Sequence, residues 1–164
     1  MIDCAYIEMM TTYNQWFNER LFKCCGALSD QDLKRDRGAF FKSIYGTLNH
    51  LLECDYQFLA SFTAQPVPPR SESAFLYPAF ADMWQARSAL DRRLCDWSRT
   101  PTPEWLLKPV TFESRADGLP RTVPRAAFVV HMFNHQTHHR GQVTTLLSQA
   151  GLDVGLTDLH GSFR

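Results

Sequence analysis

The sequence PRAAFVVHMFNHQTHHRGQVTTLLSQAG, residues 124–151, predicts a helix that begins at Pro124 and ends near Ala150-Gly151. Pro124 suits the first turn of a helix, and Gly151 suits the position just after its end. Two of the histidines in this segment, His135 and His139, are four residues apart, so they project from one face about one turn apart. This spacing is typical of two ligands of one metal ion, because neutral imidazole is a common metal donor in proteins.

The histidine pair lies on the apolar face of the predicted helix. At about 100° per residue, both histidines share a stripe with Phe128, His131, Met132, Gln142, Val143 and Leu146. A buried imidazole needs partners for its N–H and its lone pair, and a metal ion supplies one. The alternatives are core histidines satisfied by hydrogen bonds, or a histidine-rich surface turn. His131 ranks lower as a ligand, and His138 is expected beside the site or at its rim.

A third ligand is expected from another segment, because two histidines seldom hold a metal ion tightly in water. The best candidate is His50, in the sequence TLNHLLECD of residues 47–55. On a helical wheel the aliphatic side chains of this segment lie away from His50, which shares its side with Cys54. Either this helix has two buried faces or His50 is a surface histidine. Cys54 is a rival ligand or an ordinary buried thiol. His160, in a glycine-flanked tail, is expected to be exposed.

Composition excludes several classes of protein. The 164 residues fit one domain, residues 1–164, and their formal net charge of zero offers no electrostatic footprint for nucleic acid or an anionic membrane. No segment approaches the ~20 apolar residues of a membrane span, and the first residues lack a signal-peptide pattern, so we expect a cytoplasmic protein. The 5 cysteines form no C-x-x-C pair, which favours reduced thiols over a disulfide scaffold.

Helical periodicity predicts three further helices, over residues 3–28, 43–64 and 77–98. Residues 109–123 change to an alternating pattern around the turn sequence Ala116-Asp117-Gly118, which predicts a short β-hairpin. Four helices of about 20 residues or more with one minor hairpin predict an all-α four-helix bundle. Metal sites in such bundles are usually built from side chains of facing helices.

Two polar residues, Asn14 and Arg140, are candidates for binding a cofactor. Asn14 falls in the apolar stripe of the first predicted helix, where a buried amide needs hydrogen-bond partners. The alternative for Asn14 is a bridge to neighbouring backbone. Arg140 follows a candidate ligand and could bind an anionic thiol such as glutathione; the alternative is a solvated or helix-capping arginine.

Apolar side chains off the inward helix faces predict a subunit interface. Phe133, Val130 and Thr137 lie off the histidine stripe, and Trp16 lies opposite the inward face of the first helix. Exposed apolar groups often mark such interfaces. We therefore expect a homodimer, the commonest oligomer.

Three motifs occur in the first, second and fourth predicted helices: YNQWFN (13–18), TLNHLL (47–52) and NHQTHHRGQ (134–142). Together they resemble the DinB/YfiT-like family of proposed metalloenzymes, over nearly the whole chain. The resemblance implies a bundle of up-down-down-up topology and a divalent metal held by three histidines, which correspond here to His50, His135 and His139.

The resemblance also implies a range of activities, because relatives include thiol-dependent S-transferases and a thiol-dependent isomerase, while many members have no known activity. Three neutral histidines around Zn, Ni, Mn or Fe leave an open position and two positive charges, which lower the pKa of a bound thiol or water. We therefore expect a metal-dependent transferase or hydrolase of a small molecule, with a low-molecular-weight thiol such as glutathione as cofactor. The alternative is a non-catalytic, metal-binding stress-response protein.

Overall fold

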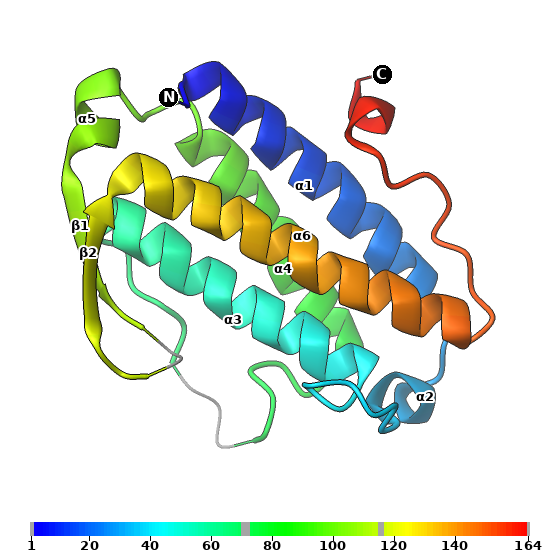
Figure 1. Ribbon diagram of the computed structural model, residues 1–164. Coiled ribbons are helices and arrows are strands. Elements are labelled where there is room, and N and C mark those ends of the chain that lie inside the picture. The colour runs from blue at the N-terminus through cyan, green and yellow to red at the C-terminus, as the bar shows by residue number, and fades with distance from the viewer. Residues whose placement is uncertain (1, 70–72, 115–116, 164) are drawn as a thin grey trace.

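Four long helices form the body of the protein (Figure 1). The structure, a computed structural model, describes residues 2–69, 73–114 and 117–163. The long helices are α1 (Cys4–Cys25), α3 (Ile44–Thr63), α4 (Phe80–Trp97) and α6 (Arg125–Gln149). In Figure 1, α1 and α6 run in one direction and α3 and α4 in the other. The predicted four-helix bundle and its up-down-down-up topology are confirmed.

Local chemistry decides where the helices begin. The hydroxyl of Ser43 accepts a hydrogen bond from the backbone N–H of Gly46 and caps α3. Helix α4 begins at Phe80, three residues later than predicted. The carbonyl of Tyr77 accepts a hydrogen bond of 2.6 Å from the hydroxyl of Tyr45, so the chain at Tyr77 is tied to α3 before the helix starts.

A two-stranded antiparallel sheet precedes α6, as predicted. Strand β1 (Pro109–Glu113) pairs with β2 (Pro120–Pro124) over its full length, with the first residue of each opposite the last of the other. The predicted turn includes Ala116, which lies outside the described residues. The sheet contacts α6 through Phe112, whose ring stacks on that of Phe128 with centroids 4.4 Å apart.

Three short helical segments lie where the sequence predicts none: α2 (Asp30–Lys34), α5 (Pro103–Leu107) and η1 (Leu159–Ser162). They have 5, 5 and 4 residues, which is too short for an apolar periodicity to show. Ser29 caps α2 by accepting a hydrogen bond from the N–H of Asp32.

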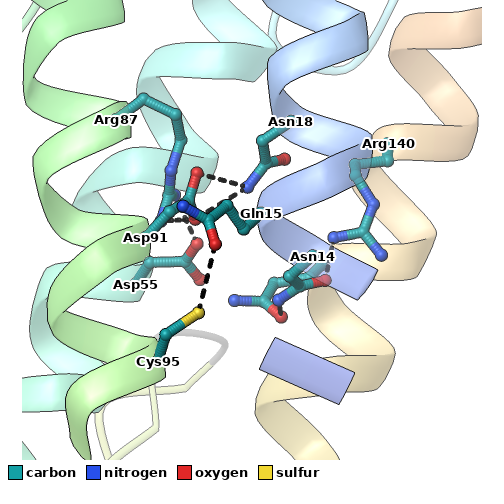
Figure 2. Close-up of polar contacts among 9 residues, drawn as sticks. Asn14, Gln15, Asn18, Asp55, Arg87, Asp91, Cys95 and Arg140 are labelled. Atoms are coloured by element: carbon teal, nitrogen blue, oxygen red, sulfur yellow. Dashed lines mark hydrogen bonds and ion pairs between the residues drawn. The ribbon is translucent and has the colours of Figure 1, made fainter. Parts of the chain in front are cut away.

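The core contains a polar network to which all four long helices contribute (Figure 2). In one half, Arg87 of α4 donates to Asp55 of α3 at 2.6 Å and to Asp91 at 2.8 Å. Asn18 of α1 donates to Asp91 at 3.0 Å. All four side chains are buried. Because desolvating an ion costs several kcal/mol, these partners are what makes the buried carboxylates tolerable.

The other half of the network contains the two residues expected to bind a cofactor. Arg140 of α6 donates to Asn14 of α1, and Asn14 donates to Gln136. The guanidinium of Arg140 also lies 5.2 Å from the ring centre of Tyr13 and 4.8 Å from that of Phe17. Arg140 has no exposed surface, so the alternative of a solvated arginine is wrong, and burial lowers its pKa to about 10. Asn14 bridges to side chains rather than to backbone.

The apolar residues that suggested a dimer are partly covered by the chain itself. Phe133 is buried, with its ring edge-on to Tyr6 at a centroid distance of 6.0 Å. Trp16 stacks on Tyr13 and carries the guanidinium of Arg20 over its ring. The assumption that Phe133 is exposed is therefore wrong, because α1 covers this side of α6. A homodimer stays a prediction, without Phe133 in its interface.

No disulfide bond links the 5 cysteines, which all lie among the described residues, as the absence of C-x-x-C spacing predicted. Among the described residues, no helix is long and apolar enough to cross a membrane.

Candidate metal centre

Three histidine rings from α3 and α6 converge beside the core. Nε2 of His50 lies 3.2 Å from Nε2 of His135. The ring centre of His139 lies 4.6 Å from that of His50 and 4.4 Å from that of His135. Helix α3 packs against both α4 and α6, so it has two covered faces, and His50 lies on the one that meets α6. The alternative of a surface His50 is therefore wrong.

The separation of the two nitrogens fits a shared metal ion. Two nitrogens bound at about 2.0 to 2.1 Å to a tetrahedral zinc ion lie about 3.3 to 3.4 Å apart. The Nε2 atoms of His50 and His135 are 3.2 Å apart, which needs only a small adjustment. Without a metal, the same distance allows one ring to donate a hydrogen bond to the other.

Cys54 lies next to His50, one turn further along α3. Its Sγ is 3.8 Å from Nδ1 and 3.7 Å from Nε2 of His50. One donor atom from each of His50, Cys54 and His135 lies within 4.8 Å of the others, so this group can hold a metal ion. Cys54 is therefore a rival to His139, or an additional ligand beside it.

The orientation of His139 is fixed by Gln142, one turn further along α6. Nδ1 of His139 lies 2.7 Å from Oε1 of Gln142. With its proton on Nδ1, His139 donates to this oxygen and keeps the lone pair of Nε2 for a metal, an arrangement typical of histidine ligands. The amide nitrogen of Gln142 lies 3.2 Å from Nε2 of His138. His138 is exposed beside the site, as predicted.

Burial favours the neutral form of two of the three histidines, His135 and His139. Burial, together with the neighbouring rings of His139 and His50, lowers the pKa of His135 to about 3. Burial also lowers the pKa of His139, against the effect of its hydrogen bond to Gln142. Because a metal binds only deprotonated imidazole, these shifts favour metal binding at neutral pH.

Phe41 forms one wall of the site, although nothing in the sequence marks it. Its ring stacks on that of His50 at a centroid distance of 3.9 Å and an angle of 19°, and meets His139 edge-on at 5.5 Å. This approach requires Gly46 in the first turn of α3, because a Cβ there would clash with the carbonyl oxygen of Phe41. Phe41 lies in a loop without periodicity, so only the fold brings it to His50.

A cavity of about 530 Å³ opens beside the donor atoms, between α3, α6 and β1. His50, Cys54 and His135 line one part of it. The other lining residues are Gln57, Phe58, Ser61, Thr111, Phe112, Glu113, Ser114, Phe128 and His131. Neither Asn14 nor Arg140 lines this cavity, so their role in binding a cofactor stays a prediction. His160 lies in η1 and is exposed, as expected.

In a comparison with known protein families, the DinB family profile matches residues 1–163. The chain belongs to the DinB family. Protein DinB of Bacillus subtilis (strain 168) is 24% identical over 155 residues, which cover 89% of this chain and 87% of the relative. The uncharacterized protein YrdA of the same organism is 39% identical over 44 residues, 27% of this chain and 26% of the relative.

A solved structure confirms the DinB-like fold. The crystal structure of a DinB-like protein from Bacillus cereus ATCC 10987 superposes with a TM-score of 0.65 at 20% identity. The match covers 85% of this chain and 89% of that chain. At this identity the likeness concerns the fold alone.

Proposed function

We propose that this protein binds one divalent metal ion through His50, His135 and His139 and uses it to activate a thiol or water against a small electrophile. The observation that supports this most strongly is the convergence of three histidine rings beside a cavity large enough for a substrate, which His50 and His135 line. Zinc, nickel, manganese and iron all suit an all-imidazole site, so the metal available decides which is bound.

When bound, such an ion would lower the pKa of a thiol or water that it coordinates, and so supply a nucleophile at neutral pH. The protein has to keep the lone pairs of the imidazole nitrogens available to the metal and to exclude water that competes with the substrate. Gln142 holds the proton of His139 on Nδ1, and the ring of Phe41 covers one side of His50. His131 lines the cavity one turn from His135, where it can accept the proton that the nucleophile releases.

In the proposed reaction, the electrophilic carbon group of the substrate is transferred to the sulfur of a thiol or to the oxygen of water. A bond forms between the nucleophilic atom and the electrophilic carbon, and the leaving group departs with the bonding electron pair. The proton of the thiol or water leaves through His131 or solvent, so charge balances. With a low-molecular-weight thiol such as glutathione the protein is an S-transferase, and with water it is a hydrolase.

The test pairs His139→Ala with His138→Ala, its exposed neighbour on the same helix. Protein purified without a metal-affinity step is analysed for metal, reloaded, and assayed with glutathione and 1-chloro-2,4-dinitrobenzene. We expect one metal per chain in the wild type and His138→Ala, and loss of metal and thiol transfer together in His139→Ala. A His139→Ala protein that lost metal but kept full transfer would contradict the catalytic role.

The second candidate is a non-catalytic metal-binding protein, and Cys54 is the observation that favours it. Structural zinc sites have four protein ligands, whereas catalytic ones keep a position open. A thiolate from Cys54 in addition to the three imidazoles would close the site. In cobalt-loaded protein, a sulfur-to-cobalt charge-transfer band that disappears in Cys54→Ser would support this alternative. A spectrum that Cys54→Ser leaves unchanged, and that responds to added glutathione, would support the enzyme.

A further inference from the structure

We infer that the cavity between α3, α6 and β1 binds a flat, uncharged aromatic compound, with one end against the donor atoms of His50 and His135. This inference rests on the proposed function, because it takes the cavity as the substrate site of that function. It adds the chemical class of the substrate, which the donor atoms alone do not indicate.

The walls of the cavity carry aromatic rings from three different elements. Phe58 comes from α3, Phe112 from β1 and Phe128 from α6. The ring of Phe128 stacks on that of Phe112 at 4.4 Å and is tilted against that of Phe58 at 5.1 Å. Offset-stacked and edge-on contacts with such rings favour a planar apolar ligand over a branched or strongly hydrated one.

The aromatic wall continues to the candidate metal centre. Phe58 lies edge-on to His135 at a centroid distance of 5.7 Å, and His135 lies 5.2 Å from His50. A flat ligand on Phe58 and Phe128 therefore has one edge at the donor atoms and the other at β1. This places the reacting end at the metal and leaves the rest of the compound to the rings.

The polar residues of the cavity are mostly uncharged. They include the amide of Gln57 and the hydroxyls of Ser61, Thr111 and Ser114, while Glu113 supplies a negative charge. No lysine or arginine occurs among the described residues that line the cavity. Without a cationic partner, and with the carboxylate of Glu113 in the same cavity, an anionic substituent far from the metal would lose affinity here.

The volume also fits a compound of this class. Pockets that bind small organic molecules usually enclose about 300 to 1,000 Å³. The cavity measures about 530 Å³, which leaves room for a fused two-ring compound with a substituent.

The test uses metal-free protein, so that it can fail separately from the proposed function. N-phenyl-1-naphthylamine is neutral, and 1-anilinonaphthalene-8-sulfonate has the same rings with a sulfonate; both fluoresce more strongly when they leave water. Ser61→Trp places a large ring at the exposed edge of the cavity. Ser148→Trp, at an exposed serine of α6 outside the cavity lining, is the matched control.

We expect saturable binding of one neutral probe per chain, with affinity reduced by about tenfold or more in Ser61→Trp and unchanged in Ser148→Trp. Phe112→Ala should weaken binding in the same direction without enlarging any side chain. The sulfonate should bind about tenfold more weakly than the neutral probe. Unsaturable binding, equal affinity for both tryptophan variants, or a sulfonate that binds as tightly as the neutral probe would overturn the inference. Failure of metal binding with intact probe binding would overturn only the proposed function.

Discussion

Arg87→Met tests the buried polar network that holds α3 and α4 together. Arg87 is the cation that contacts Asp55 at 2.6 Å and Asp91 at 2.8 Å, and all three side chains are buried. Removing one partner of a buried ion pair typically costs about 3 to 5 kcal/mol. At about 2 to 4 °C per kcal/mol for a domain of this size, the melting temperature should fall by roughly 10 °C.

The pH dependence of this loss follows from the carboxylates. Burial raises the pKa of Asp91 to about 6, although Arg87 and Asn18 lower it. In the unfolded chain the pKa is ~3.9. The folded protein therefore binds more protons between these values, so the contribution of Asp91 to stability is greatest at low pH and is lost as the pH rises through 6. Without Arg87 the folded pKa should rise further, so the deficit of the variant should be larger at pH 8 than at pH 5.

Denaturant unfolding of the wild type, Arg87→Met and Arg92→Met at pH 5 and pH 8 measures these differences. Arg92 is an exposed neighbour on the same helix, so its replacement should change the free energy of unfolding by no more than about 0.5 kcal/mol. The reasoning would be refuted if Arg87→Met were no less stable than Arg92→Met at pH 8, or if its deficit grew on acidification.

Three further predictions concern the candidate metal centre. Phe41→Ala should weaken zinc binding about two- to tenfold, which corresponds to the loss of an aromatic contact of about 0.5 to 1.5 kcal/mol. Phe40→Ala should leave zinc affinity unchanged. Competition with a chelator measures both affinities, and an equal loss in the two variants would count against a role for Phe41 in positioning the site. Gln142→Leu should lower zinc affinity about ten- to a hundredfold in the same competition measurement, because His139 loses the partner that orients it. An unchanged zinc affinity would contradict this role of Gln142. Because the pKa of His135 is lowered to about 3, zinc should stay bound at pH values below the ordinary histidine pKa near ~6.5. The zinc content of samples dialysed at different pH values measures this. If half of the zinc were already lost above pH ~6.5, the electrostatic account would be contradicted.

The long helices could be predicted because their apolar residues repeat over many turns. The prediction of the helix around His135 and His139 agrees with α6 to within two residues at either end. The start of α4 could not be predicted, because it depends on a hydrogen bond between Tyr45 and Tyr77, 32 residues apart. Local patterns carry no information about such contacts.

The main reason why the site could only be predicted in part is that some of its helices are buried on two faces. The helical wheel could not decide whether His50 is a metal ligand or a surface histidine, because a single apolar stripe does not show that α3 is covered from two sides. The same limit produced the wrong expectation for Phe133, which lies off the stripe of α6 but is covered by α1. The burial of Arg140 likewise could not be predicted, because its partners, Asn14 and the rings of Tyr13 and Phe17, come from another helix.

The cavity could not be predicted from any single segment. Its walls come from α3, β1 and α6, and the pattern of the hairpin predicted its strands but not that Phe112 would face Phe128. Similarly, Phe41 precedes α3 in a loop, and only the close approach permitted by Gly46 brings its ring onto His50. Both features depend on tertiary packing rather than on local periodicity.

Zinc-edge X-ray absorption of the loaded protein tests the metal centre most directly. The account predicts one zinc ion per chain with imidazole nitrogens at about 2.0 to 2.1 Å, and one imidazole fewer, or no bound zinc, in each of His50→Ala, His135→Ala and His139→Ala. A sulfur ligand at about 2.3 Å in place of one imidazole, with His139→Ala leaving the spectrum unchanged, would contradict it, because the site would then be His50, Cys54 and His135.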